Sequence, residues 1–339
     1  PYFRQIENSA GGGDAWRGDS GPINVQRLSS FHPLEQAFLD AAEQAGYSKI
    51  ADYNGADQQG VTAFDVNIGA GQRSATAAAC IRPIRQRHNF TMRARAYVTR
   101  LIIDNRKAVG VEYLQRGKLR RVMANAEIIV CAGAFQSPQI LMLSGIGPAD
   151  ELRSHGIEPI LNLGGVGANL HDHLEVHVKH RCPRGLSKNG LLRKDRLLLA
   201  GLRWFLSQSG TAATTHSRVG GFLRTDDSVD YPNLQYHFWP FFLEGWSPPP
   251  AKDGYCFDVG PVRTRSRGWV RLRSANPLDA PRMLLNGLSL ESDLIEFRQC
   301  IRLTREIASQ AAFDSFRGPE VSPGPKVTSD REIDQYVRN

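Results

Sequence analysis

The 339-residue sequence contains no apolar run of about 18 residues, the length that a helix needs to cross a bilayer. We therefore expect no transmembrane segment. Cysteine is also scarce, and the five residues form no Cys-x-x-Cys pair. An odd, scattered set is not typical of a disulfide framework or a cysteine metal site, and it favours a reducing compartment. We expect a cytoplasmic protein, with association to a membrane left open.

The sequence lacks the G-x-G-x-x-G fingerprint that binds a dinucleotide pyrophosphate after a buried strand. The nearest approach, at residues 164–167 (GGVG), has no third glycine at the required spacing and follows no buried strand. The net charge of +8 is spread along the chain without an interleaved aromatic platform, so nucleic acid is not an expected partner. A hydrophobic content of 41% and a charged content of 22% are ordinary for a globular protein.

The most informative stretch runs from residue 127 to residue 147. Residues 128–130 (IIV) are β-branched and apolar, which predicts a strand buried on both faces. The run ends at Ala132, Gly133 and Ala134, three small residues that let a backbone or a flat ligand approach closely. A strand, a small-residue turn and a helix would place this turn at the carboxyl edge of an open α/β sheet, where ligands bind.

Periodicity predicts most of the other elements. Apolar residues at helical spacing predict one helix that begins at Ser137-Pro138. They predict three more helices at 33–45, 191–206 and 290–310. Alternation predicts strands at 90–100, 108–114, 120–122, 232–240, 255–262 and 268–272. The second half, with several strands and then a long helix, indicates an antiparallel sheet with helices on one face. This change of class places a domain boundary near residue 175.

Residues 133–147 (GAFQSPQILMLSGIG) resemble the second signature of the glucose-methanol-choline (GMC) flavoprotein oxidoreductases. That signature has a Gly-Ala pair, then Ser-Pro, two aliphatic residues and Ser-Gly-aliphatic-Gly. Residues 233–238, 266–272 and 313–324 resemble the choline dehydrogenases of this family, and the resemblance covers essentially the whole chain. The implied fold is α/β plus α+β. Residues 1–175 would form part of an FAD-binding (Rossmann-like) domain, and residues 176–339 a substrate domain of antiparallel sheet and helices.

The resemblance implies FAD as the cofactor and a small primary alcohol as the substrate, oxidised to an aldehyde by hydride transfer to the flavin. It assigns Val98, in the segment AYVTR, to the strand whose main chain holds the flavin adenine. We add Ala132, Gly133 and Ala134 as candidate cofactor-binding residues. In the family, the pyrophosphate fingerprint precedes the first residue of this chain, and the principal catalytic histidine follows Asn339. An internal fragment that is inactive alone is therefore expected.

His237 matches a histidine in the substrate cavity of choline-oxidising relatives, where it could hydrogen-bond the alcohol oxygen. A core histidine with a backbone partner is the alternative. Those relatives carry a glutamate two residues before a Gly-Gly-Phe turn, where this chain has Arg218. A cation facing the cavity would repel choline, which leaves a neutral or acidic alcohol as a second possibility. Trp239 and Trp246 are candidates for an aromatic cage around a cation, or for core and rim positions.

Four residues would share one face of a strand (His171, His173, Glu175 and His177), which suggests a metal site. Alternate strand residues lie roughly 6.5 to 7 Å apart, too far to converge easily on one ion. Residues 169–173 also resemble a family segment that needs no metal, so no metal is expected. Two other functions stay open: a hydroxynitrile lyase and a non-catalytic β-rich binding module. The electron acceptor is unknown from the sequence.

Overall fold

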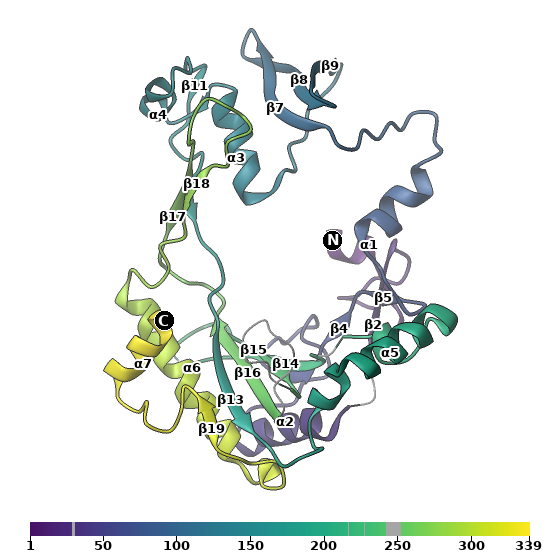
Figure 1. Ribbon diagram of the computed structural model, residues 1–339, viewed down its shortest axis with the longest axis vertical. Coiled ribbons are helices and arrows are strands. Elements are labelled where there is room, and N and C mark those ends of the chain that lie inside the picture. The colour runs from purple at the N-terminus through teal and green to yellow at the C-terminus, as the bar shows by residue number, and fades with distance from the viewer. Residues whose placement is uncertain (29–30, 216, 227, 242–251) are drawn as a thin grey trace. The chain divides into compact units, whose positions relative to one another are not determined.

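The computed structural model describes residues 1–28, 31–215, 217–226, 228–241 and 252–339. Trp246, a candidate cage residue, lies outside the described residues. The chain forms two compact units, each traced in Figure 1. Unit 1 comprises Pro1–Arg87, His173–Arg263 and Glu291–Asn339, and unit 2 comprises His88–Asp172 and Thr264–Leu290. The division of the chain into two family domains near residue 175 stays a prediction.

Unit 1 is built on a six-stranded antiparallel sheet with the strand order β19-β13-β16-β15-β14-β3. The strands are β3 (Gly60–Ala63), β13 (Val176–Arg181), β14 (Val219–Leu223), β15 (Leu234–Trp239), β16 (Gly254–Pro261) and β19 (Glu320–Ser322). The antiparallel sheet that the alternation predicted is therefore confirmed, as are the strands expected at 232–240 and 255–262.

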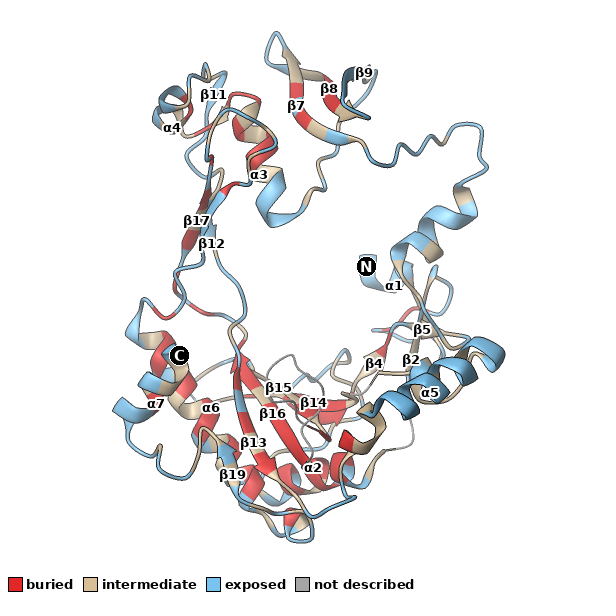
Figure 2. Ribbon diagram, in the orientation of Figure 1, coloured by how far each residue is buried: buried red, intermediate tan, exposed pale blue. Residues whose placement is uncertain are grey.

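Two helices, α2 (Pro33–Gln44) and α6 (Glu291–Ser309), pack on one face of this sheet and form the main core with it. Leu234, Tyr236 and Phe238 of β15 are fully buried on this face, as Figure 2 shows for the central strands. The Phe238 ring stacks on Phe38 of α2, with 5.0 Å between the ring centroids. Because neighbouring residues of a strand face opposite ways, Gln235, His237 and Trp239 are directed to the other face.

The rest of unit 1 consists of short strands and peripheral helices. They are α1 (Tyr2–Ile6), β1 (Glu7–Ser9), β2 (Ile23–Arg27), β4 (Asp65–Val66), β5 (Ile68–Gly69), β6 (Gln72–Arg73), α5 (Lys194–Ser207) and α7 (Asp330–Arg338). A capping box of Ser329 and Glu332 begins α7. In the described part of the chain, no helix has the length and apolar character needed to cross a membrane.

Unit 2 contains two three-stranded antiparallel sheets. The predicted meander is confirmed as β7 (Tyr97–Asp104), β8 (Lys107–Gln115) and β9 (Lys118–Met123). Its first strand, expected at 90–100, begins only at Tyr97. The second sheet comprises β12 (Ala168–Leu170), β17 (Gly268–Arg271) and β18 (Arg282–Leu284). The other elements are α3 (Gly133–Leu143), β10 (Ile146–Gly147), α4 (Ala149–Ser154) and β11 (Leu161–Asn162).

The expected strand at residues 128–130 is absent from the structure, and Ile129 is 75% exposed. A β-strand exists only when a neighbour completes its hydrogen-bond ladder, and the described chain offers none here. The next helix, α3, also begins five residues earlier than expected, at Gly133 instead of Pro138. Ser137 is inside the helix, where its Oγ accepts a hydrogen bond of 3.1 Å from the Ala132 amide. The predicted strand was wrong, and the predicted helix start was late.

Candidate substrate and cofactor sites

His237 projects from β15 on the face of the sheet opposite the core, and it lines a cavity of about 690 Å³ within unit 1. Four aromatic residues line the same cavity: Tyr53, Phe64, Phe222 and Trp239. The His237 ring lies 5.2 Å from the Phe64 ring, measured between centroids. Of the two roles considered for His237, this position agrees with a cavity residue rather than a core histidine.

Gly220 makes room for this arrangement. It pairs directly with His237 across the β14–β15 ladder. A Cβ atom on Gly220 would lie 2.3 Å from Cζ of Phe64 and 2.1 Å from the Tyr236 carbonyl oxygen. Both distances are far below van der Waals contact, so a side chain at this position would displace the Phe64 ring. The glycine therefore allows Phe64 to lie against the strand beside His237.

Aromatic faces form one wall of the cavity. Tyr53 meets Phe64 edge to face with 5.5 Å between the ring centroids, and it lies 5.8 Å from Phe222. Such π-faces attract organic cations as well as apolar groups. The wall suits the alkyl part of an alcohol, and it equally suits a quaternary ammonium group.

Two buried polar atoms of cavity residues, Thr214 Oγ1 and Trp239 Nε1, have no hydrogen-bond partner among the described residues. An unsatisfied buried donor costs about 1 to 3 kcal/mol, so native proteins leave few of them without a protein, water or ligand partner. Both atoms are almost inaccessible to solvent, so they are buried behind the lining and do not by themselves identify a ligand.

Arg218 is not among the described residues that line this cavity. Its Nη2 and Nε atoms instead bind the two carboxylate oxygens of Glu35, at 2.5 and 3.1 Å. Glu35 lies on α2, has no exposed surface and also accepts a hydrogen bond of 2.8 Å from Lys188 Nζ. Burial alone would raise the pKa of the Glu35 carboxyl, but the hydrogen bonds from Arg218 and Lys188 hold that pKa below its usual value.

The sequence argument that Arg218 opposes choline therefore loses its basis, because the guanidinium is ion-paired with Glu35 and is not among the described residues that line the cavity. Two charged residues line the cavity in the described chain, Asp65 and Arg73. Asp65 has an almost fully buried side chain that is ion-paired with Arg17 and Arg27. The described lining thus presents one carboxylate that is already paired and one cation, Arg73, so its charges do not by themselves favour a cationic substrate.

A smaller cavity of about 250 Å³ in unit 2 brings together Val98 and Ala132, two of the predicted cofactor-binding residues. Val98 lies on β7, an edge strand of its sheet, and Ala132 immediately precedes α3. The hydroxyl of Tyr97, another lining residue, donates a hydrogen bond of 2.8 Å to the Pro277 carbonyl. Residues 34 positions apart in the sequence thus meet at one hollow.

Gly133 and Ala134 form the first turn of α3 and do not line this cavity. Gly133 has a φ of +83°, which favours glycine, and a Cβ there would meet nothing within 4 Å. The backbone of this turn is therefore open to an approaching group. Together with the Val98 and Ala132 hollow, this opening fits the flat cofactor that the sequence predicts, although the roles of all four residues stay predictions.

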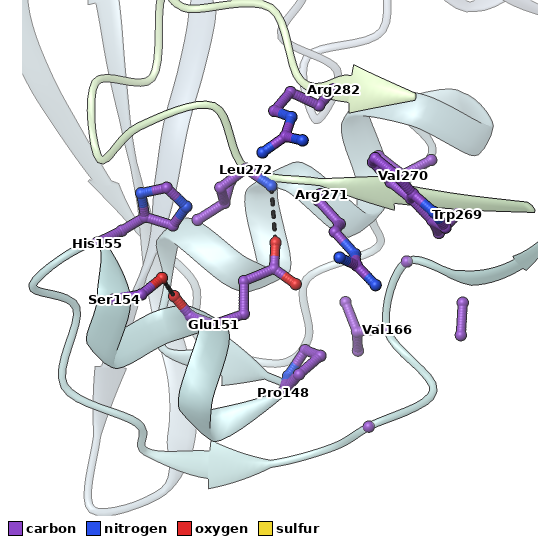
Figure 3. Close-up of a pocket in the computed structure, with 13 residues that line it drawn as sticks. Pro148, Glu151, Ser154, His155, Val166, Trp269, Val270, Arg271, Leu272 and Arg282 are labelled. Atoms are coloured by element: carbon purple, nitrogen blue, oxygen red, sulfur yellow. Dashed lines mark hydrogen bonds between the residues drawn. The ribbon is translucent and has the colours of Figure 1, made fainter. Parts of the chain in front are cut away.

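Figure 3 shows another cavity of unit 2, with a volume of about 520 Å³, which contains none of the predicted site residues. The Glu151 carboxylate of α4 accepts a hydrogen bond of 2.9 Å from the Leu272 amide, and it thereby ties α4 to the end of β17. The Arg271 guanidinium lies 4.5 Å from the centroid of the Trp269 ring. These contacts hold α4 against the β17–β18 hairpin, and we interpret the residues around this cavity as packing between the two elements.

The four residues of the metal hypothesis are not gathered into one cluster. Only His177 lies on β13, where it joins Cys256 and Asp258 of β16 in a group whose possible ligand atoms lie within 4.8 Å of one another. The His177 Nδ1 atom is 2.5 Å from Asp258 Oδ1, and the Cys256 thiol donates to the same oxygen at 3.0 Å. The hydrogen bond to Asp258 raises the pKa of His177. These polar atoms satisfy one another, and the absence of a bound metal stays a prediction.

Two family models described as GMC oxidoreductase match the chain, one over residues 1–175 and the other over residues 264–339. The chain belongs to the GMC oxidoreductase family. It is 42% identical over 339 residues to the mitochondrial choline dehydrogenase of Mus musculus. This alignment covers 100% of this chain and 57% of that protein. It is also 42% identical over 341 residues to the oxygen-dependent choline dehydrogenase of Staphylococcus xylosus, with coverage of 100% and 61%.

Solved structures agree with this assignment. A formate oxidase from Aspergillus oryzae superposes with a TM-score of 0.89 at 25% identity, covering 99% of this chain and 65% of that one. A pyridoxine 4-oxidase from Mesorbium loti gives a TM-score of 0.84 at 26% identity, covering 99% and 63%. The chain therefore spans less than two thirds of each of these relatives. The expected family is confirmed, and so is the expected mixed fold of helices and antiparallel sheets.

Sequence reasoning found His237 and Trp239 but missed Tyr53, Phe64 and Thr214 as residues of the same cavity. These positions come from separate loops and short strands, and no local spacing connects them. The one available signal was the glycine pair at 220–221, because two glycines within a predicted strand indicate the close approach of another group.

Proposed function

We propose that the protein to which this chain belongs oxidises a primary alcohol to an aldehyde with FAD, and that choline is its leading candidate substrate. The family assignment supports FAD as the cofactor, and the two choline dehydrogenases support the substrate class. The observation that supports this proposal most is the His237 cavity, which combines an imidazole that can hydrogen-bond an alcohol oxygen with an aromatic wall.

In this reaction the alcohol loses a proton from its hydroxyl group and a hydride from the adjacent carbon. FAD, when bound, supplies the acceptor for the hydride. We assign to His237 a hydrogen bond to the substrate oxygen, which becomes stronger as negative charge develops there. By the family resemblance, the base that removes the hydroxyl proton lies beyond Asn339. The isolated chain is accordingly expected to be inactive.

The aromatic wall would hold the substituent of the alcohol. Tyr53, Phe64 and Phe222 present ring faces and edges that suit the trimethylammonium group of choline, and Arg218 does not oppose it. A neutral or acidic alcohol is the alternative substrate within the same chemistry. Neither the electron acceptor nor the choice between oxidase and dehydrogenase follows from these residues.

The test is anaerobic mixing of the full-length flavoprotein with choline, and separately with neutral primary alcohols, while the flavin absorbance is followed. We expect choline to bleach the flavin. Bleaching by neutral alcohols alone would keep alcohol oxidation and overturn choline. A flavin that no alcohol bleaches would contradict the proposal and favour a lyase, and a full-length protein that carries no flavin would favour a binding module.

A further inference from the structure

Three polar side chains lie in one row across the sheet of unit 1: His237 of β15, Asp258 of β16 and His177 of β13. The register pairs His237 directly with Asp258, and Asp258 directly with His177. The three strands are neighbours in the sheet (Figure 1). Residues that pair directly across an antiparallel ladder point to the same face, with their Cβ atoms about 4.5 to 5.5 Å apart. The row therefore begins at the candidate substrate cavity and continues along the face of the sheet opposite the core.

The two residues of this row beyond His237 form a close pair. The His177 Nδ1 atom lies 2.5 Å from Asp258 Oδ1. The Asp258 side chain is only 13% exposed, whereas the His177 side chain is 50% exposed. The pair is neutral overall when His177 carries a proton, and it is net negative when His177 does not. The proton on His177 thus decides whether an uncompensated carboxylate lies beside His237.

Charged residues of β13 and β16 act on this proton. The hydrogen bond to Asp258 raises the pKa of His177 above its usual value, and burial opposes that rise. Among the neighbours on β13, Lys179 lowers the pKa of His177 and Glu175 raises it. Asp258 is therefore the group that holds the proton on His177.

Two further titratable groups lie close to His177. Cys256 is two residues from Asp258 on β16, and the hydroxyl of Tyr336 on α7 donates a hydrogen bond of 2.7 Å to the His177 carbonyl. Burial raises the pKa of the Cys256 thiol and that of the Tyr336 phenol, so both groups stay neutral near pH 7. On the adjacent strand β19, the Glu320 carboxylate is bound by Arg305, at 2.8 Å.

We propose that His177 and Asp258 are a positioning pair for the alcohol oxidation, in which protonated His177 compensates the Asp258 charge beside His237. This inference rests on the proposed function, in which His237 hydrogen-bonds the substrate oxygen as negative charge develops there. An uncompensated carboxylate one strand away would repel that charge. At the effective dielectric constant near a protein surface, such repulsion slows the reaction by about three- to tenfold. Neither residue of the pair is among the described residues that line the cavity, so the pair acts through charge.

The experiment measures anaerobic flavin reduction by the alcohol in the full-length flavoprotein. Rates are recorded at about pH 6 and at about two pH units above the folded pKa of His177, which an NMR titration locates. The test variant is His177→Gln, and the rescue variant combines His177→Gln with Asp258→Asn. The matched control is Glu112→Gln, which removes a carboxylate that pairs across the β7–β8–β9 ladder of unit 2. Thermal unfolding is recorded for every protein.

We expect His177→Gln to reduce its flavin about three- to tenfold more slowly than the wild type at about pH 6. The difference should disappear at the higher pH, where His177 of the wild type has also lost its proton. Adding Asp258→Asn should restore the rate at about pH 6, and the control should show no pH-dependent difference from the wild type. A slow His177→Gln variant that Asp258→Asn does not restore would show a structural defect and overturn the inference. Equal rates of His177→Gln and the wild type at about pH 6 would also overturn it.

An NMR measurement without substrate separates this inference from the proposed function. In the histidine-labelled full-length protein, the ring resonances of His237 should shift at the pH at which His177 titrates. Asp258→Asn should move this shift to lower pH, because His177 then loses the group that holds its proton. A flavin that no alcohol reduces would contradict the proposed function, and the NMR coupling would then decide alone whether the pair acts on His237. A His237 resonance that is insensitive to the titration of His177 would overturn the inference even if the alcohol is oxidised.

Discussion

At the scale of single residues, Gly220 fixes the position of an aromatic ring in the candidate substrate cavity. Replacement by alanine would bring a methyl group into both Phe64 and the Tyr236 carbonyl. We expect Gly220→Ala to destabilise the protein by about 1 to 3 kcal/mol, the usual effect of overpacking, and to disturb the cavity. Thermal or urea unfolding measures the change.

The matched control is Gly201→Ala in α5, where an added Cβ would meet nothing within 4 Å. Alanine there should stabilise the helix by about 0.5 to 1 kcal/mol, because glycine is a poor helix former. If the two alanine variants were equally stable, the tight approach of Phe64 to the strand would be wrong.

A second residue-scale prediction concerns Glu35, which is fully buried and holds both Arg218 and Lys188. Glu35→Gln would leave two partly buried cations without their counter-charge. Removing one partner of a buried ion pair typically costs about 3 to 5 kcal/mol. Asp40→Asn is the control, since Asp40 pairs with Lys49 at the surface and should change stability by less than about 1 kcal/mol. Equal effects in urea unfolding would contradict the assigned role of Glu35.

At the scale of elements, the cross-strand pair of His177 on β13 and Asp258 on β16 predicts a pH dependence. The hydrogen bond to Asp258 raises the pKa of His177 in the folded protein above its usual value of about 6.5. Its stabilisation is therefore fully present below about pH 6.5 and is lost as the pH rises through the folded pKa. Nearby Glu175 acts in the same direction as Asp258, and Lys179 opposes it.

Replacing Asp258 by asparagine should return the His177 pKa toward its usual value, which an NMR titration of the imidazole would show. The loss of stability on going from pH 6 to pH 8 should also become smaller in this variant. Unchanged titration of His177 would show that the carboxylate is not what holds its proton.

The elements that could be predicted from the sequence are those whose partners are also in the described chain. The strand at 232–240 alternates because one of its faces meets the core under α2 and α6, whereas the strand at 255–262 is buried at nearly every position inside the sheet. In both strands the pattern of apolar residues already encodes the packing. The run at 128–130 has equal apolar content, but no neighbouring strand in the described chain pairs with it. The local pattern of apolar residues predicts only that a segment can form a strand. The strand itself forms when a second strand completes its ladder of backbone hydrogen bonds.

At the scale of the whole molecule, the family could be predicted from residues 133–147 and the cavity could not. The signature is contiguous, whereas the aromatic wall brings together positions 53, 64, 222 and 239. The role of Arg218 was also misjudged. Its offset from the glycine pair is local, but its true partner, Glu35, lies 183 residues away. Long-range pairing of this kind leaves no trace in spacing.

The central claim is that the His237 cavity receives the alcohol, and it is tested most directly by the rate of anaerobic flavin reduction in full-length His237→Ala. Loss of one hydrogen-bond donor to the developing negative charge should slow reduction by about 100-fold. His237→Gln, which keeps a donor, should recover part of the rate. His155→Ala changes a residue of the separate cavity shown in Figure 3, and it should leave the rate of flavin reduction unchanged. Reduction by His237→Ala at the wild-type rate would contradict the assignment of this cavity as the substrate site.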